Sequence, residues 1–359
     1  MDSKYARPPP NPDVYQTPEV DIKGSWDEAS VKNKTFLITG GASGIGAGMA
    51  KKLAGLGGTV IIGDLQNAQS FVDEVRKSTG NPNIHSVQCD MTNYKSQCDM
   101  FRKALELSPK KAIDSVIANA GVNEVGKNFV PRPFGQLLPY PSFQAVPRTK
   151  KLSTVPGQSE DPEEPNLTTM NVNITGVIYT AYLAMQYFRG HPHLSTDAYP
   201  NAEHDRSIVF IGSIASLYPL THAPFYNASK HAVLGLFRSL RQTAKPDRVR
   251  VNLLCPYWIE TPIIPLGAKV LLAGTDYAQM EDVVDIGVRC LGDYSVAGHI
   301  FLVLPRSTGG VVEIFNDEPK DLDTFNRNAV YALNKVSAAQ SWIEWGKNVV
   351  LAMLGLYRS

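Results

Sequence analysis

The stretch TGGASGIG at residues 39–46 separates an apolar run typical of a β-strand, residues 34–39, from a helical pattern at residues 47–54. Glycine accepts positive φ angles and lets the backbone approach a phosphate closely. The start of the following helix offers unpaired N–H groups and the positive end of the helix dipole. A glycine-rich turn between a strand and a helix is typical of a dinucleotide-binding fold. The alternative is a glycine-rich loop that binds nothing.

A second apolar run, residues 59–64, ends in Asp64. A carboxylate at the end of this strand can accept hydrogen bonds from the adenosine ribose hydroxyls of a dinucleotide. It would also repel a 2′-phosphate, and the residues that follow, Leu65-Gln66-Asn67, include no arginine to bind one. The sequence therefore favours NAD over NADP. The alternative is a solvated carboxylate at a strand end.

Further along the chain, a buried-strand pattern at residues 207–213 ends in Ser213, at the sheet edge where open α/β folds bind ligands. A helix predicted to begin at Pro224 carries Tyr226 and Lys230, which share one face because they are four residues apart. A lysine beside a phenol lowers the pKa of the phenol. Tyr226 could then act as a general base on an alcohol, while Ser213 binds the substrate oxygen.

These motifs resemble those of the short-chain dehydrogenase/reductase family over about residues 33–315. The resemblance implies an α/β fold, a single doubly wound Rossmann-type parallel sheet with helices on both faces. It also implies an oxidoreductase that interconverts a secondary alcohol and a ketone with NAD. The sequences NAGVNE at residues 119–124 and LCP at residues 254–256 are similar to the NAD-dependent 15-hydroxyprostaglandin dehydrogenase type, including its fungal pathway relatives in secondary metabolism.

The resemblance also implies roles for individual residues. Asn173 would complete a water-mediated proton relay, Asp90 would contact the adenine, and Thr261 would bind the nicotinamide carboxamide. The catalytic residues expected from the sequence are Asn173, Ser213, Tyr226 and Lys230. The residues expected to bind the cofactor are Gly40, Ser43, Gly44, Ile45, Gly46, Asp64, Asp90, Met91, Asn119, Gly121, Tyr226, Lys230, Ile259 and Thr261.

The chain departs from the family pattern in two places. Tyr257 stands where the family usually has a glycine, so the backbone turn that carries Ile259 and Thr261 could differ. Residues 123–168 form a longer connection than usual, rich in proline and charge, beside the expected active-site edge. This connection could help to choose the substrate or could be a passive surface insertion. The aliphatic residues between 262 and 280 suggest an apolar alcohol.

Composition narrows the class of protein further. The 359-residue chain has a formal net charge of +1, which argues against broad electrostatic binding of nucleic acid. Its four cysteines lack the spacing of a metal site. The polar, proline-rich N-terminus has no apolar segment typical of a signal peptide, so we expect a cytoplasmic protein.

We expect three parts: an extended N-terminal arm at residues 1–32, a dinucleotide-binding catalytic domain at residues 33–317, and an amphipathic helical extension at residues 318–359. The apolar stripe of the extension is too short to cross a membrane. It could pack on its own domain, contact a second subunit, cover the substrate or lie on a membrane surface. Members of the family commonly form oligomers, so the resemblance also implies a homo-oligomer.

The competing hypothesis for function is a cofactor-bound scaffold that senses redox state or assists a non-redox step. The complete set of Ser213, Tyr226 and Lys230 argues against it, because a scaffold needs no tuned phenol. A second Tyr-x-x-x-Lys sequence at residues 331–335 is discounted, because no serine-bearing strand precedes it.

Overall fold

The computed structural model describes residues 16–125, 164–190, 205–220, 223–261 and 276–314. Within these ranges, eight strands form one sheet in the order β3-β2-β1-β4-β5-β6-β7-β8. The strands are β1 (Thr35–Thr39), β2 (Thr59–Asp64), β3 (Ile84–Gln88), β4 (Ser115–Ala118), β5 (Arg206–Ile211), β6 (Val249–Pro256), β7 (Ile300–Val303) and β8 (Val311–Ile314).

The sheet is parallel from β3 to β7, as the sequence predicts, and its last strand runs the other way. β7 and β8 are joined by a short connection in which Gly309 and Gly310 have positive φ angles. A connection of this length can join only antiparallel neighbours, because parallel strands need a long crossover. The strand order reverses between β1 and β4, which creates a crevice at the carboxyl ends of these strands.

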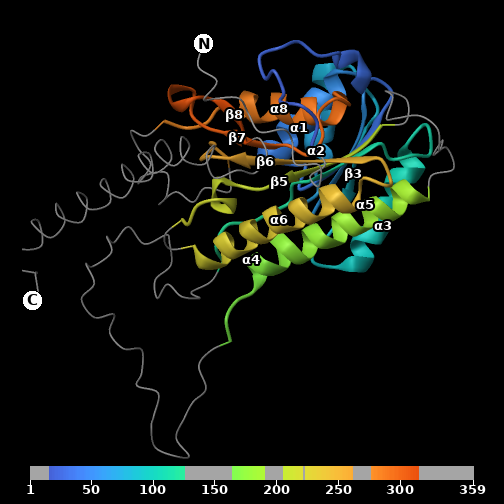
Figure 1. The fold of residues 1–359 in the computed structure, drawn as a ribbon. Coiled ribbons are helices and arrows are strands. Elements are labelled where there is room, and N and C mark those ends of the chain that lie inside the picture. Colours follow the sequence, from blue (N-terminus) through green and yellow to red (C-terminus); the bar gives the residue numbers. More distant parts are fainter. Residues whose placement is uncertain (1–15, 126–163, 191–204, 221–222, 262–275, 315–359) are drawn as a thin grey trace, which may run out of the picture.

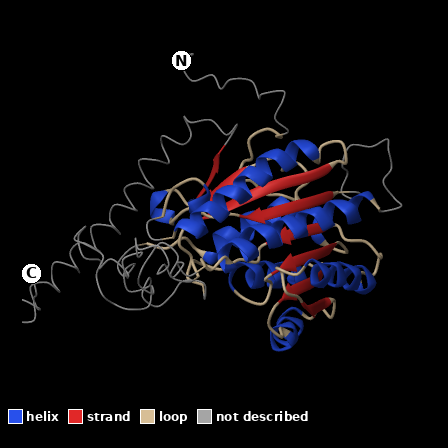
Figure 2. Ribbon diagram, turned by 90° about the horizontal axis from the view of Figure 1, so that it is seen from below, coloured by secondary structure: helices blue, strands red, loops and turns tan. Residues whose placement is uncertain are grey.

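Helices cover both faces of the sheet, with α1, α2 and α8 on one face and α3, α5 and α6 on the other (Figures 1 and 2). A short α4 and a π-helical turn, η3, lead into α5, and a 3-10 turn, η4, follows β5. The helical elements are α1 (Gly44–Gly55), α2 (Gln69–Thr79), α3 (Tyr94–Leu107), α4 (Thr168–Met170), η3 (Asn171–Gly176), α5 (Val177–Arg189), η4 (Ile214–Ser216), α6 (Pro224–Thr243) and α8 (Met280–Gly292), with further 3-10 turns at η2 (Glu28–Val31) and η5 (Arg306–Thr308).

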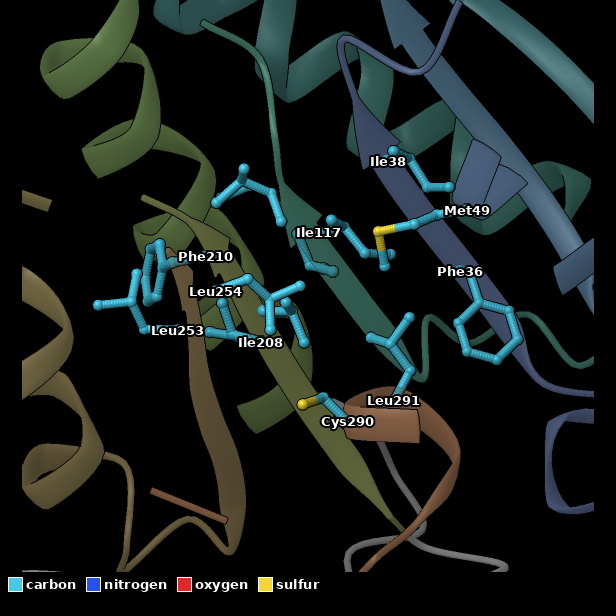
Figure 3. Close-up of a cluster of buried hydrophobic side chains, with 14 of the residues drawn as sticks. Phe36, Ile38, Met49, Ile117, Ile208, Phe210, Leu253, Leu254, Cys290 and Leu291 are labelled. Atoms are coloured by element: carbon cyan, nitrogen blue, oxygen red, sulfur yellow. The ribbon is translucent and has the colours of Figure 1, made fainter. Parts of the chain in front are cut away.

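The central strands are buried along their whole length because both faces of the sheet are covered. Figure 3 shows side chains of these strands, including Phe36, Ile117 and Phe210, in one cluster with Met49 of α1 and Leu291 of α8. This core holds the strand ends, and therefore the site, in a fixed arrangement.

Buried charged side chains lie at the edge of the sheet where the parallel strands begin, opposite the crevice at their carboxyl ends. Arg250 is fully buried and donates to both carboxylate oxygens of Asp205, at 2.6 and 2.7 Å. Lys34 also donates to Asp205, at 3.2 Å. Burial alone would raise the pKa of Asp205, but Arg250 and Lys34 more than offset this and lower it. The pairing therefore joins the starts of β1, β5 and β6.

Residues 16–32, which fall within the predicted arm, pack against the domain. The backbone N–H of Thr17 donates to Ala297 at 2.9 Å, and Val20 and Val31 are buried. The rest of the arm, most of the predicted insertion, the C-terminal extension and the second Tyr-x-x-x-Lys sequence lie outside the described residues. The division of the chain into three parts therefore stays a prediction.

Replacing Arg250 by methionine should lower the free energy of unfolding by about 3–5 kcal/mol, because Asp205 would stay buried without its main partner. The matched control is Arg306→Met, which removes an ion pair to Asp282 whose arginine side chain is 65% exposed. The control should cost about 0–1 kcal/mol. Chemical denaturation of both variants tests this, and equal losses would contradict it.

Candidate active site

A cavity of about 400 Å³ lies at the carboxyl ends of the central strands. It contains most of the residues that the sequence predicts, from segments far apart in the chain. The predicted residues that line it are Gly40, Ser43, Gly44, Ile45, Asp64, Asp90, Met91, Asn119, Gly121, Ser213, Tyr226, Lys230, Ile259 and Thr261. Two predicted residues, Gly46 and Asn173, lie behind its wall.

The glycine turn after β1 has the shape that a pyrophosphate needs. Gly40 and Gly44 have φ angles of +61° and +54°, which disfavour other residues. A Cβ atom on Gly46 would lie 2.4 Å from the carbonyl oxygen of Gly40, so Gly46 serves packing within the turn. Helix α1 begins at Gly44, and no side chain caps its first turn. Its N–H groups therefore face the cavity as an anion-binding end, which fits a dinucleotide phosphate.

Asn119 holds this turn from the neighbouring strand. Its side-chain Nδ2 donates to the carbonyl oxygens of Thr39 at 2.9 Å and Gly40 at 2.8 Å. Its backbone N–H donates to the Thr39 hydroxyl at 3.0 Å. Asn119 therefore fixes the glycine turn to the end of β4, in addition to lining the cavity.

Asp64 and Asp90 lie at or just after the ends of the neighbouring strands β2 and β3 and line the same cavity. Asp64 ends β2, and its carboxylate accepts the backbone N–H groups of Ala42 and Gln66, both at 3.1 Å. Asp90 accepts the backbone N–H and the hydroxyl of Thr92, at 2.8 and 2.7 Å. These local hydrogen bonds fix both carboxylates at the rim, where they could meet the adenosine part of a dinucleotide.

Ser213, Tyr226 and Lys230 meet at the middle of the cavity. The Ser213 hydroxyl caps the short turn η4 by accepting the N–H of Ala215 at 3.1 Å, and it also hydrogen-bonds the Tyr226 hydroxyl. The Lys230 Nζ lies 5.7 Å from the centre of the Tyr226 ring and donates to the carbonyl oxygen of Ile211 at 3.0 Å. The three side chains come from the end of β5 and the first turns of α6.

The pKa of Tyr226 differs from the sequence expectation. Burial raises the pKa of Tyr226, and the hydrogen bond from Ser213 opposes this shift without reversing it. The pKa of Tyr226 is therefore raised, where the sequence predicts a lowered value. Burial lowers the pKa of Lys230 from 10.5 to about 8. The physical reason is shared, because a site with little water favours the neutral form of both groups.

Asn173 lies in the π-helical turn η3, is 1% exposed and supports the site from behind. Its Oδ1 accepts the N–H of Val122 and its Nδ2 donates to the carbonyl oxygen of Val122, both at 2.8 Å. Its Nδ2 also donates to Ser229 at 3.1 Å. A Cβ atom on Gly121 would lie 3.3 Å from the Asn173 Oδ1 and 3.6 Å from the Lys230 Nζ. Gly121 therefore leaves space between the asparagine and the lysine.

Tyr257 does not prevent the expected turn after β6. Its φ angle is not among the positive ones, its N–H donates to Val303 at 2.8 Å, and its side chain is 6% exposed. Burial raises the pKa of Tyr257 to about 12, so its hydroxyl is neutral at ordinary pH. Ile259 and Thr261 still reach the cavity.

Sequence reasoning did not single out several residues of the site. Asn123, Val172, Ile214, Leu220 and Trp258 also line the cavity. They lie beside the predicted motifs, but their side-chain types carry no chemical signal of their own. Glu124 was also missed, although its carboxylate accepts the backbone N–H of Tyr226 at 2.8 Å. This contact joins residues 102 positions apart, so no local pattern indicates it.

Within the described part of the chain, no group of histidine, cysteine or acidic residues could hold a metal ion. Among the same residues, no helix has the length and apolar character needed to cross a membrane.

Comparisons with known proteins agree with this geometry. A model of the family described as short chain dehydrogenase matches residues 34–133 and 153–266. The 5′-hydroxyaverantin dehydrogenase of Dothistroma septosporum is 31% identical over 292 residues, which are 79% of this chain and 88% of that protein. The NADP-dependent dehydrogenase clz5 of Cochliobolus lunatus is 28% identical over 291 residues, 79% of this chain and 92% of that protein.

The fold also matches a solved structure. The 3-ketoacyl-(acyl-carrier-protein) reductase from Brucella melitensis, complexed with NADH, has a TM-score of 0.56 and 19% identity, and the match covers 76% of this chain and 97% of that one. The predicted resemblance to the family and its fungal pathway relatives is thus confirmed, while the likeness to the prostaglandin dehydrogenase type stays a prediction. The family model matches more than half of the chain, and the chain therefore belongs to the short-chain dehydrogenase family.

Proposed function

We propose that this oxidoreductase interconverts a secondary alcohol and a ketone with NAD, with Tyr226 as the general acid and base. The observation that carries the proposal is the meeting of the Ser213 and Tyr226 hydroxyls beside Lys230, in the same cavity as the glycine turn. In the oxidation, the substrate loses a hydride from carbon and a proton from oxygen. The nicotinamide, when bound, accepts the hydride.

The protein handles the proton. The Tyr226 oxygen takes it from the substrate hydroxyl, and Ser213 orients the substrate oxygen by a hydrogen bond. In the reduction, the neutral Tyr226 hydroxyl returns the proton to the carbonyl oxygen. Lys230, when protonated, stabilises the ionised form of Tyr226. Asn173 is the residue we assign to the proton relay behind the lysine.

The lining of the cavity favours an apolar substrate. It includes the aliphatic and aromatic side chains of Leu220, Tyr257 and Trp258. Burial of apolar substrate surface against these side chains would contribute to binding. Hydrogen bonds to Ser213 and Tyr226 would then fix the reacting oxygen.

NAD is the cofactor that Asp64 favours, although some relatives carry names that state NADP dependence. The carboxylate lies at the end of β2, where a 2′-phosphate would meet a like charge. Leu65 and Gln66, which also line this end of the cavity, carry no positive charge to compensate.

We also propose a homo-oligomer formed through the outer face of α5. Ile178 and Tyr182 on this helix are 46% and 52% exposed, and Tyr94 of α3 beside them is 42% exposed. Tyr94 contacts Tyr179 with ring centres 5.1 Å apart, so the aromatic side chains form a continuous patch. An exposed apolar patch on a folded domain is typical of a contact surface.

Replacing Tyr226 by phenylalanine tests the proposed chemistry. The variant should lose a factor of about 10²–10⁴ in kcat, because it lacks the acid–base group. The measurement is NADH formation with cyclohexanol and α-tetralol, and NADH oxidation with the corresponding ketones. NADH binding, followed by fluorescence, should stay nearly unchanged. A variant that keeps the wild-type kcat would contradict the assignment and favour the scaffold hypothesis.

Replacing Asp64 by asparagine tests the cofactor preference. We expect wild-type protein to bind NADH more tightly than NADPH, and the variant to reduce this ratio by about tenfold, since one charge repulsion is removed. Fluorescence titration with both cofactors gives the ratio. As a control, Asp90→Asn at the adenine end should change both affinities alike. Tighter binding of NADPH than NADH by the wild type would overturn the assignment.

Replacing Lys230 by methionine should stabilise the fold at pH 7 while abolishing turnover. Because the folded protein lowers the Lys230 pKa from 10.5 to about 8, the buried charge destabilises the fold fully below pH 8. Between pH 8 and pH 10.5, Lys230 is more protonated in the unfolded chain than in the folded protein. The destabilisation by the buried charge therefore decreases as the pH rises towards 10.5. The gain should reach up to about 3 kcal/mol at pH 7, less about 1 kcal/mol for the lost hydrogen bond to Ile211.

Thermal unfolding at pH 7 and pH 10 gives the comparison. Lys95→Met is the matched control, because the Lys95 side chain is 82% exposed and its loss should change the stability little at either pH. An equal stabilisation by Lys230→Met at both pH values, or none at pH 7, would contradict the prediction.

A further inference from the structure

The helix that carries Tyr226 lacks a cap from its own sequence. The residue before its first turn is Ala223, whose side chain makes no capping hydrogen bond, and Pro224 follows it. The first regular hydrogen bond of the helix is donated by Asn227 to the carbonyl oxygen of Ala223, at 2.9 Å. The N–H of Tyr226 precedes this bond and needs an acceptor from elsewhere.

Glu124 supplies that acceptor. Its Oε2 lies 2.8 Å from the backbone nitrogen of Tyr226, although the two residues are 102 positions apart in the chain. Here the capped residue is the one whose hydroxyl takes part in the proposed chemistry.

The segment that carries Glu124 is itself held firmly. The N–H of Glu124 donates to the side chain of Asn123 at 2.8 Å. The Thr169 hydroxyl donates to the carbonyl oxygen of Asn123 at 3.0 Å and accepts the N–H of Val125 at 2.9 Å. With Asn173 bonded to Val122, contacts from α4 and η3 fix the backbone on both sides of Glu124. Its carboxylate is therefore a fixed support for Tyr226.

Glu124 acts on Tyr226 through the backbone. It does not line the cavity, whereas Asn123 and Tyr226 do. The contact through which Glu124 reaches Tyr226 is therefore the hydrogen bond that it accepts from the Tyr226 backbone N–H.

We propose that Glu124 is a positioning residue that holds Tyr226 in line with Ser213 and the substrate oxygen. The inference rests on the proposed function, because it assumes that the Tyr226 hydroxyl transfers the proton. Misplacement of an acid–base group by about 1 Å can cost about 10²-fold in rate. The same segment reaches the glycine turn through Asn119, so the tyrosine and the phosphate-binding turn share one support.

Two substitutions separate hydrogen bonding from charge. Glu124→Gln keeps an acceptor oxygen at the same reach, and Glu124→Ala removes it. We expect kcat of Glu124→Ala with cyclohexanol and α-tetralol to fall by about tenfold or more, with KM and NADH affinity changed little. Glu124→Gln should restore most of the wild-type kcat.

A control and a second measurement exclude a general loss of stability. Asp27→Ala removes another carboxylate that caps a short helix, at 3.0 Å from the N–H of Ala29 and away from the cavity residues. It should lower the melting temperature modestly and leave kcat unchanged. Hydrogen–deuterium exchange of the peptide that contains Tyr226 should be faster in Glu124→Ala than in the wild type and Glu124→Gln.

The outcomes distinguish this inference from the proposed function. If Tyr226→Phe is inactive while Glu124→Ala keeps the wild-type kcat, the positioning role is wrong and the chemistry stands. If Tyr226→Phe stays active, or the wild type turns over neither alcohol, the proposed function fails. Hydrogen–deuterium exchange still tests the inference in that case, because unchanged exchange in Glu124→Ala would show that Glu124 does not support Tyr226. A Glu124→Gln variant as inactive as Glu124→Ala would mean that the charge matters, which contradicts the inference.

Discussion

The two-way hydrogen bonding between the Asn173 side chain and the Val122 backbone is the contact on which the rest of the site depends. An asparagine amide can pair with a backbone N–H and carbonyl much as a neighbouring strand would, and here both distances are 2.8 Å. The same amide reaches Ser229, whose hydroxyl donates to the carbonyl oxygen of Tyr226 at 2.8 Å. One buried side chain thus connects the segment after β4 to helix α6, which carries Tyr226 and Lys230. The π-helical turn presents Asn173 at this junction.

The two edges of the sheet divide stability from chemistry. At the amino ends, Arg250 and Asp205 are buried and paired with each other, so they join strands without exposing reactive groups. At the carboxyl ends, the protein leaves helix N–H groups uncapped in α1 and buries a lysine with a lowered pKa. These features are unfavourable for folding, and the proposed function assigns them to cofactor binding and proton transfer. The paired edge and the packed core keep the other edge in place.

The sequence predicted those parts of the site that depend on local spacing. The glycine turn and the Tyr226–Lys230 face follow from a strand-to-helix turn and a four-residue repeat, and both occur as expected. Contacts between distant segments left no local signal, and Glu124 with Tyr226 is the clearest example. The antiparallel direction of β8 and the backbone conformation at Tyr257 likewise depend on contacts with neighbouring strands.

The direction of the Tyr226 pKa shift also could not be predicted from local spacing, because it depends on how much water the folded cavity excludes. Exclusion of water favours a neutral phenol and a neutral amine, and the two shifts are in opposite directions on the pH scale. Neither charge is favourable alone, but a phenolate and an ammonium side by side stabilise each other. In the proposed reaction, this mutual stabilisation would let the buried Tyr226 act as both acid and base.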